Sequence, residues 1–203
     1  MSERVRTAVL ISGRGSNMMA LVRAAQARDY PAEVVLVVSN RPEAAGLRKA
    51  DAAGIPAIAI DHSDHPDRES FERELDAALR DHEVDFVACA GFMRVLTPWF
   101  VDRWAGRLIN IHPSLLPKYK GLHTHRRALE AGDAQAGASV HWVVSEVDGG
   151  DVIDAETIPI EPSDTEDTLS AKVLARELVL YPRALARAVT GLRGAHAQGD
   201  RKR

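Results

Sequence analysis

Short runs of apolar, largely β-branched residues constrain the fold of this chain most strongly. Val5–Ser12 reads VRTAVLIS and Glu33–Ser39 reads EVVLVVS, and each run ends close to a glycine or a proline. Ile55–Ile60 and Val84–Ala90 repeat the pattern, and segments with helical spacing separate the runs. Strands that are apolar on both faces and alternate with helices are typical of a parallel sheet with helices on both sides. The sequence therefore predicts an α/β fold.

The C-terminal half of the chain follows a different pattern. Leu108–Ile111 predicts a fifth strand, and the breakers after it predict a long loop over 113–133. Ser139–Ser145 and Asp151–Ile160 predict an antiparallel hairpin, because a strong Asp-Gly-Gly turn signal lies between them. Asp164–Val189 predicts a last helix that Pro182, within it, should kink or break.

Taken together, these patterns predict one Rossmann-like domain over residues 1–192. Its sheet should be twisted and mostly parallel, with helices on both faces and an antiparallel C-terminal hairpin. Residues 193–203 are small, polar and basic, which predicts a disordered tail. The other predicted helices cover Ser16–Arg28, Glu43–Ala53, Asp67–His82 and a segment that begins at Pro98 with Thr97 as its N-cap.

Composition excludes several classes of protein. The 203 residues carry 26 basic and 29 acidic side chains, so the net charge of −3 argues against broad affinity for nucleic acid or an anionic membrane. The single cysteine, Cys89, lies in an apolar run and is expected to be a small buried hydrophobe. No apolar stretch approaches about 20 residues, so we expect a cytoplasmic protein. As a separate expectation, the protein is a monomer or a homodimer.

A glycine-rich loop is the first candidate site. It reads Ser12-Gly-Arg-Gly-Ser-Asn17 and lies between the first strand and the first helix. Glycines allow a ligand to approach the backbone, and the N-terminus of a helix offers free N–H groups to a phosphate. The spacing matches neither the dinucleotide fingerprint nor the Walker loop. The residues alone leave open a phosphate loop or a plain tight turn.

The second candidate site is Asn110-Ile-His112, at the end of the fifth strand. In an extended segment both polar side chains point to the same face. An asparagine amide can donate to a developing oxyanion, and a histidine can move a proton near neutral pH. The alternative is structural, with Asn110 closing a turn and His112 capping the strand end. The residues by themselves do not decide between the two.

The third candidate is Asp148, in Ser145-Glu-Val-Asp-Gly-Gly150. As part of a common turn, this aspartate need have no role beyond the turn itself. As a carboxylate on a loop, it could pair with an imidazole and favour its protonated form. His141, on a predicted strand, is left open in the same way between a position facing the site and a hydrogen-bonded core histidine.

These candidates fall within longer segments that resemble one family. The chain to about Leu192 is similar to the monofunctional, folate-dependent phosphoribosylglycinamide formyltransferases. The matching segments are Val9–Gly13 with Gly15–Asn17, Ala90–Arg94, Gly106–Tyr119, Gly121–Arg126, Ser139–His141 and Asp148–Gly150. No single one of these motifs is specific to the family, but the whole set of motifs is.

The resemblance implies a role for each matching position. It implies formyl transfer from 10-formyltetrahydrofolate, as co-substrate, to the amine of glycinamide ribonucleotide, with no metal. It makes the N-terminal half the ribonucleotide-binding part and the C-terminal half the folate-binding part. The implied catalytic residues are Asn110, His112 and Asp148, and the implied ribonucleotide-binding residues are Gly15, Ser16, Asn17 and Glu177. The implied folate-binding residues are Arg68, Met93, Arg94, Val95, Leu96, Asn110, Val144, Ser145, Glu146, Val147 and Asp148.

Two departures and four rival functions accompany this resemblance. Lys120 stands where the family pattern has a proline, and Arg14 lies between the loop glycines, which puts loop mobility and affinity in doubt.

One rival, a formyltransferase that acts on initiator methionyl-tRNA, would share the catalytic core but would need a further RNA-binding domain. A formyltetrahydrofolate hydrolase would share the three catalytic residues. A metal-dependent hydrolase would use His112, His123, His125 and His141, without an adjacent carboxylate to complete a familiar ligand set. A nucleotide-binding module would leave the catalytic residues unexplained.

Overall fold

The computed structural model describes residues 4–199 and shows a seven-stranded sheet in the order β3-β2-β1-β4-β5-β6-β7. Strands β1 to β5 are parallel to one another, β6 is antiparallel to β5, and β7 is antiparallel to β6. The strands are β1 (Val5–Ile11), β2 (Ala32–Ser39), β3 (Ala57–Ala59), β4 (Phe86–Cys89), β5 (Leu108–His112), β6 (Gln135–Trp142) and β7 (Val152–Pro159). The predicted mostly parallel sheet with an antiparallel C-terminal hairpin is confirmed.

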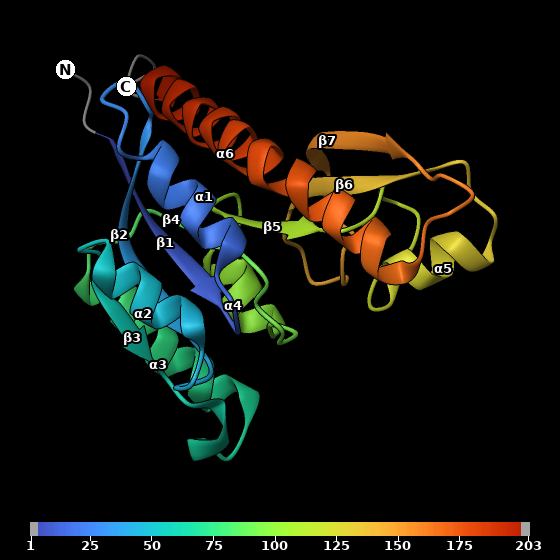
Figure 1. Ribbon diagram of the computed structural model, residues 1–203. Coiled ribbons are helices and arrows are strands. Elements are labelled where there is room, and N and C mark those ends of the chain that lie inside the picture. The colour runs from blue at the N-terminus through green and yellow to red at the C-terminus, as the bar shows by residue number, and fades with distance from the viewer. Residues whose placement is uncertain (1–3, 200–203) are drawn as a thin grey trace.

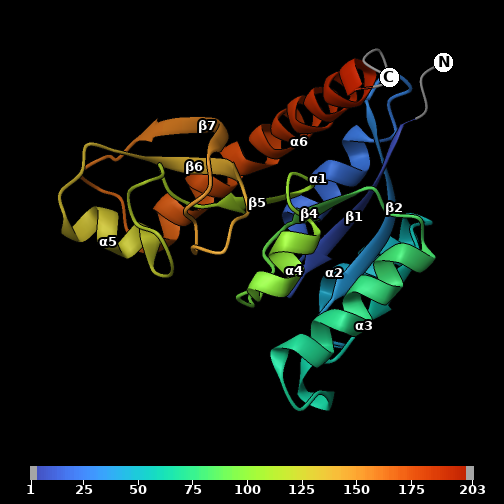
Figure 2. The same ribbon diagram turned by 180° about the vertical axis from the view of Figure 1, so that it is seen from behind.

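Helices cover both faces of this sheet (Figures 1 and 2). On one face α1, α2 and α6 enclose a core that contains Met18, Leu21 and Tyr181, and on the other α3 and α4 enclose Phe71 and Phe100. The helices are α1 (Ser16–Ala24), α2 (Ala45–Ala52), α3 (Arg68–Asp81), α4 (Pro98–Arg103), α5 (Thr124–Glu130) and α6 (Glu166–Gly199), with a short 3-10 turn at His62–Asp64.

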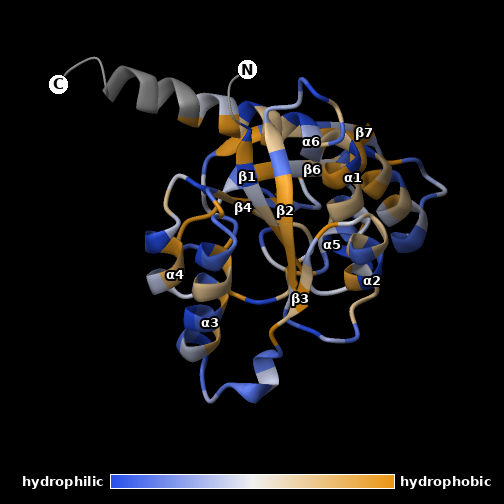
Figure 3. Cartoon of the chain, turned by 90° about the vertical axis from the view of Figure 1, so that its left-hand side faces the viewer, coloured by the Kyte–Doolittle hydropathy of each residue, from blue (hydrophilic) through white to orange (hydrophobic). Residues whose placement is uncertain are grey.

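Hydropathy follows this layering. Figure 3 shows strand β2 as largely hydrophobic, whereas α3 presents a hydrophilic outer surface. The Cys89 side chain in β4 is buried, and burial raises the pKa of its thiol to about 12, which confirms a core residue rather than a reactive one. Apolar strands between two helical layers are the reason that the parallel sheet forms.

Two helices, α5 and α6, differ from the sequence-based prediction. The segment 113–133, predicted as loop, contains α5, whose N-cap His123 makes no side-chain capping bond, so the usual start signal is absent. Helix α6 continues through Pro182, which packs beside Tyr30, and the Tyr30 hydroxyl donates to the Pro182 carbonyl. The same helix runs on to Gly199, beyond the predicted domain end at residue 192, although the glycines at 191, 194 and 199 have low helix propensity. Residues 200–203 of the predicted tail lie outside the described residues.

The strand order places the candidate residues together. Since β2 and β4 lie on either side of β1, the crossovers that leave β1 and β4 diverge at the carboxyl edge of these strands. Open α/β sheets bind ligands at such a switch point. The Ser12 amide donates to the Gly91 carbonyl (3.1 Å), so the segments that follow β1 and β4 are in direct contact there.

Candidate active site

Four polar side chains form a connected cluster where β5, β6 and the β6–β7 connection meet. Asn110 and His112 lie on β5, and Asn110 is paired with His141 on β6. The Asn110 Nδ2 atom lies 3.3 Å from His141 Nε2. Asp148 lies between the two imidazoles, with Oδ1 3.4 Å from His141 Nε2 and Oδ2 3.3 Å from His112 Nδ1. The structure therefore brings the three predicted catalytic residues together and adds His141.

Backbone geometry holds Asp148 in this position. Its φ is +50°, a left-handed conformation that aspartate and asparagine adopt more readily than most residues. The Gly121 amide donates to Oδ2 at 2.9 Å, which joins the loop after β5 to the loop after β6. Burial acts to raise the pKa of Asp148, but the bonds from His141 and Gly121 and the His112 charge outweigh it and hold the pKa below its ordinary value. The carboxylate is therefore ionised at neutral pH.

His112 is buried and faces an acceptor at each ring nitrogen. Its Nε2 lies 2.9 Å from the Tyr119 carbonyl oxygen, which can only accept, so Nε2 carries the proton of that bond. Its Nδ1 faces Asp148. Burial lowers the pKa of His112, while the Tyr119 carbonyl and the Asp148 carboxylate act in the opposite direction. The site can thus take up or release a proton at a buried imidazole.

The glycine-rich loop opens directly onto α1. Gly15 is the N-cap of α1 and has a left-handed conformation, with φ +70° and ψ 29°. Asn17, in the first turn, donates from Nδ2 to the Glu177 carboxylate of α6 at 2.6 Å, and its buried Oδ1 atom has no hydrogen-bond partner within the described part of the chain. Burial raises the pKa of Glu177, although the bond from Asn17 partly opposes it. An orphaned acceptor beside a buried carboxyl is suited to a ligand that has hydroxyl groups.

The predicted folate-binding positions lie in two loops and at the start of α3. Met93 and Val95 are exposed in the loop after β4, and Val144 and Val147 are exposed in the loop after β6. The Met93 amide donates to the Ser12 hydroxyl at 2.7 Å, which places this loop beside the glycine-rich loop.

The remaining folate positions also surround these loops. The Arg94 guanidinium lies 5.0 Å above the Phe71 ring of α3, and exposed Arg68 begins the same helix one turn earlier. Glu146 pairs with Lys120 at 2.7 Å, so one of the two departures from the family pattern ties the loop after β5 to the loop after β6. Leu96 is half-buried and Ser145 is exposed.

Sequence reasoning missed two backbone groups and left one side chain undecided. The Tyr119 carbonyl and the Gly121 amide contact His112 and Asp148, and only the glycine at 121 gave a signal of irregular backbone. His141 faces the site and does not act only as a core residue. Its position beside Asn110 follows from a strand register that the sequence does not reveal.

Residues 4–199 contain neither a metal-binding cluster nor a membrane-spanning helix. No group of three or more histidine, cysteine, aspartate or glutamate side chains in that range is arranged to hold a metal ion. No helix in the same range is long and apolar enough to cross a membrane.

Comparison with known proteins gives a consistent family. Residues 5–185 match the formyl transferase family model. The chain is 48% identical to the phosphoribosylglycinamide formyltransferase of Escherichia coli over 86% of its length and 82% of the relative's. It is 50% identical to the trifunctional purine biosynthetic protein adenosine-3 of Drosophila melanogaster, but spans only 14% of that much longer protein.

Solved structures agree with the sequence matches. The phosphoribosylglycinamide formyltransferase of Brucella melitensis superimposes with a TM-score of 0.89 at 46% identity, covering 92% of this chain and 96% of the other. The glycinamide ribonucleotide transformylase 1 of Symbiobacterium toebii gives a TM-score of 0.91 at 37% identity, covering 94% and 90%. The chain belongs to the formyl transferase family, within its group of phosphoribosylglycinamide formyltransferases.

Proposed function

We propose that the chain transfers the formyl group of 10-formyltetrahydrofolate to the amine of glycinamide ribonucleotide in purine biosynthesis. The products are formylglycinamide ribonucleotide and tetrahydrofolate. The observation that carries the proposal is the cluster in which Asp148 lies between His112 and His141, with Asn110 beside His141. The names of the Escherichia coli and Brucella melitensis relatives support the choice of acceptor. A cytoplasmic location and a monomeric or dimeric state remain predictions.

The proposed reaction begins when the acceptor amine attacks the formyl carbon on N10 of the folate. Negative charge then develops on the formyl oxygen, to which the Asn110 amide and the His112 N–H donate. In the structure the His112 Nε2–H donates to the Tyr119 carbonyl, and we propose that the formyl oxygen replaces this acceptor. The C–N10 bond breaks as the proton from the attacking amine passes to N10, assisted by Asp148 directly or through water.

The two substrates are proposed to enter from opposite sides of this cluster. The phosphate of the ribonucleotide would bind at Gly15–Asn17, where the N-terminal amides of α1 are free, and its ribose hydroxyls would reach Glu177. The exposed apolar side chains of 93–96 and 144–147 would cover the flat pterin of the folate. The direct contact between Met93 and Ser12 supports adjacent binding of the two molecules.

An absorbance assay of folate deformylation tests the proposal. We expect turnover only when glycinamide ribonucleotide is present, and His112→Ala should lower kcat by roughly 100- to 1000-fold, the usual cost of removing one oxyanion donor. Equal consumption of folate without the ribonucleotide would identify a hydrolase instead. Near-normal turnover of His112→Ala would contradict the role of the imidazole. No consumption under any condition would leave a binding protein as the better description.

A further inference from the structure

The loop between β4 and α4 is held by contacts at its ends rather than by bonds of its own backbone. It covers residues 90–97 and contains the proposed folate positions 93–96. The backbone N–H groups of residues 94–96 have no hydrogen-bond acceptor in the part of the chain that the structure describes. The position of these residues is therefore decided by the groups that fasten the two ends of the loop.

Hydrogen bonds fasten the 90–97 loop at both ends. Near its start, the Met93 amide donates to the Ser12 hydroxyl at 2.7 Å. At its end, Thr97 donates twice to one carboxylate of α3. The Thr97 amide donates to Glu72 Oε1 at 2.8 Å, and the Thr97 hydroxyl donates to Glu72 Oε2. Helices α3 and α4 cover the same face of the sheet, so a side chain of α3 can reach the residue before α4 (Figure 2).

The Thr97 hydroxyl does not serve its own helix. Thr97 is the N-cap of α4 and precedes Pro98, and in such a position the threonine oxygen usually accepts from the first turn of the helix. No such capping bond forms, and the hydroxyl donates to Glu72 instead. The orientation of Thr97 is thus set by a carboxylate on another helix rather than by the backbone of α4.

Glu72 is a buried carboxyl that has no part in the catalytic cluster. It is 1% exposed. Burial raises the pKa of this carboxyl, while the two bonds from Thr97 and the charges of Arg94 and Arg68 act to lower it. Both arginines are proposed folate positions. A buried carboxylate is costly unless hydrogen bonds compensate, and here the compensation comes from the end of the 90–97 loop.

The residue before Glu72 contacts the same loop. The Phe92 ring stacks on the Phe71 ring of α3 with centroids 6.4 Å apart, and the Arg94 guanidinium lies 5.0 Å from the same Phe71 ring. Helix α3 therefore holds the loop through two consecutive residues. The ring contacts of Phe71 tolerate sliding, whereas the two hydrogen bonds of Glu72 are directional and fix Thr97 in one orientation.

We propose that Glu72 is a positioning residue for the folate, an inference that rests on the proposed function. Glu72 binds no substrate itself. By holding both donors of Thr97, it fixes where the 90–97 loop ends, and with it the path of residues 93–96 along the pterin. Without this anchor the loop takes several paths, of which only some fit the folate, so the apparent affinity for folate falls.

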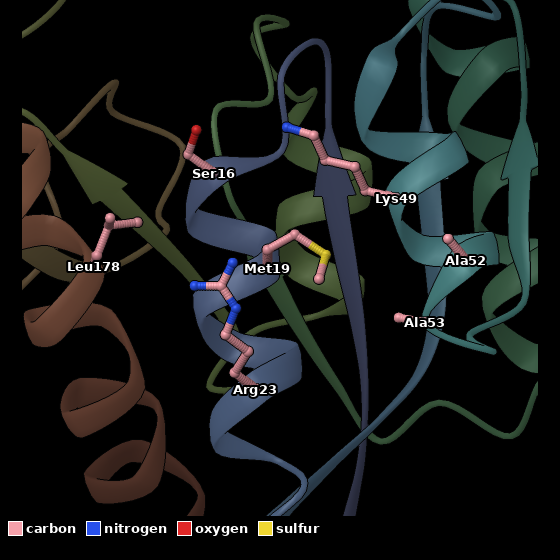
Figure 4. A pocket seen from close by; sticks show the side chains of 7 residues that line it. All are labelled: Ser16, Met19, Arg23, Lys49, Ala52, Ala53 and Leu178. Carbon is pink, nitrogen blue, oxygen red and sulfur yellow. The ribbon is translucent and has the colours of Figure 1, made fainter.

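The ribonucleotide side of the molecule is built from other elements. Figure 4 shows a pocket beside the start of α1, lined by side chains of α1, of α6 and of the segment 49–53. Neither α3 nor the 90–97 loop contributes a residue to this lining. The proposal therefore predicts a loss of affinity for one substrate only.

Four substitutions at the anchor separate its parts. Glu72→Met removes both acceptors and keeps the length of the side chain, whereas Glu72→Gln keeps an acceptor for the Thr97 amide and removes the charge. Thr97→Val removes the hydroxyl and tests the same contact without a change on α3, and Thr97→Ser keeps the hydroxyl. The double variant Glu72→Met/Thr97→Val tests whether the two residues act through one contact.

Two controls on α3 separate positioning from loss of stability. Asp76 accepts from Arg103 and Trp104 at the far end of α4, so Asp76→Ala loosens the packing of the same two helices away from the loop. Glu69 is exposed and pairs with Arg73, so Glu69→Gln removes a glutamate charge from α3 without reaching the loop.

Calorimetric titration with tetrahydrofolate measures the affinity without any turnover. We expect the Kd to rise about tenfold for Glu72→Met, the scale of a hydrogen bond to a charged group, and by a smaller factor for Glu72→Gln and Thr97→Val. The double variant should bind no more weakly than Glu72→Met alone, and Thr97→Ser should keep most of the affinity. The Kd of both controls, and the KM of every variant for glycinamide ribonucleotide, should stay within about twofold of the wild type.

The pH dependence of binding gives a second readout. The Glu72 charge is present above the raised pKa of its carboxyl and is lost as the pH falls through that value. The wild type should therefore lose its advantage over Glu72→Gln as the pH is lowered, and the ratio of the two Kd values should approach unity. A ratio that does not change with pH would overturn the role of the charge.

Three outcomes would overturn the inference alone. They are an unchanged Kd in Glu72→Met, an equal rise of the Kd in Asp76→Ala, and independent, multiplying effects of Glu72→Met and Thr97→Val. Failure of the proposed function looks different from all three. In that case the wild type would fail to bind tetrahydrofolate, or it would consume 10-formyltetrahydrofolate equally well without the ribonucleotide.

Discussion

At the scale of single residues, Asp148 combines a charge with an unusual backbone conformation, and substitutions can separate the two. Asparagine has nearly the same shape and tolerates the left-handed φ of +50°, so Asp148→Asn should fold normally. It removes the negative charge beside His112 and His141. We expect kcat to fall about 100-fold or more while both KM values change little, as measured by steady-state kinetics. Wild-type turnover in this variant would refute the electrostatic role of the carboxylate.

Glu177 illustrates a conflict between stability and binding. Burial raises the pKa of Glu177 in the folded state. The contribution of Glu177 to stability is therefore largest at low pH, where this carboxyl is protonated, and it is lost as the pH rises through the raised pKa and the carboxyl becomes charged. Glu177→Gln should therefore raise the Tm at pH 7.5, by roughly 2–4 °C if about 1 kcal/mol is recovered. The difference in Tm should shrink as the pH approaches about 4, below the ordinary glutamate pKa.

The same variant should bind the ribonucleotide more weakly. A charged carboxylate accepts hydrogen bonds from ribose hydroxyls more strongly than an amide does. Calorimetric titration at pH 7.5 would show a Kd several-fold higher for Glu177→Gln. A variant that is both less stable and unchanged in binding would contradict this account of the Asn17–Glu177 pair.

At the scale of secondary-structure elements, Asp76 joins α3 to α4. It is 2% exposed and accepts from Arg103 Nε at 2.7 Å, from Arg80 Nε at 3.0 Å and from Trp104 Nε1 at 3.2 Å. Replacing it with alanine leaves the buried Trp104 Nε1–H without an acceptor, while Arg80 and Arg103 are partly exposed and can turn to water, so Asp76→Ala should lower the free energy of unfolding by about 2 kcal/mol. Urea titration measures this loss, and exposed Asp81 at the end of α3 supplies the control, since Asp81→Ala should change it by less than about 0.5 kcal/mol.

Element by element, sequence reasoning succeeded where periodicity was strong and failed where tertiary contacts decide. The apolar runs located β1, β2 and β4 because burial on both faces leaves a continuous signal. Helix α5 gave no signal, since its seven residues start at a left-handed His123 without a capping side chain. Helix α6 passes through Pro182 because its long apolar face packs against α1 and β6, which outweighs the local cost of proline.

For the site, sequence spacing could place only neighbours in the chain. Alternation along β5 predicts that Asn110 and His112 share a face, and the structure places both beside one cluster. No pattern in the sequence predicts the contact of Asp148 with the Gly121 amide, which depends on how two loops meet. The bond between Asn17 and Glu177 joins residues 160 positions apart, so only the family resemblance linked them.

At the scale of the whole molecule, α6 lies along both halves of the fold (Figure 1). Its buried face includes Leu169, Val173, Leu180 and Leu185, and the Tyr181 hydroxyl donates to the Cys89 carbonyl of β4 at 2.7 Å. A chain that ends at residue 165 would expose the α1 face of the core. We expect this fragment to be largely unfolded by circular dichroism and not to bind the ribonucleotide. A chain that ends at Gly199 is the control and should retain both structure and binding.

The 160-residue separation between Asn17 and Glu177 also bears on how the molecule is made. A ribosome emits the glycine-rich loop 160 residues before the Glu177 carboxyl group that pairs with Asn17. Strands β1 to β5 can begin to pair during synthesis, since a chain folds from its N-terminus as it emerges. The acceptor site, however, stays open on one side until α6 has left the exit tunnel. The proposed ribonucleotide site of a nascent chain is therefore complete only once α6 has emerged, and it does not form gradually during translation.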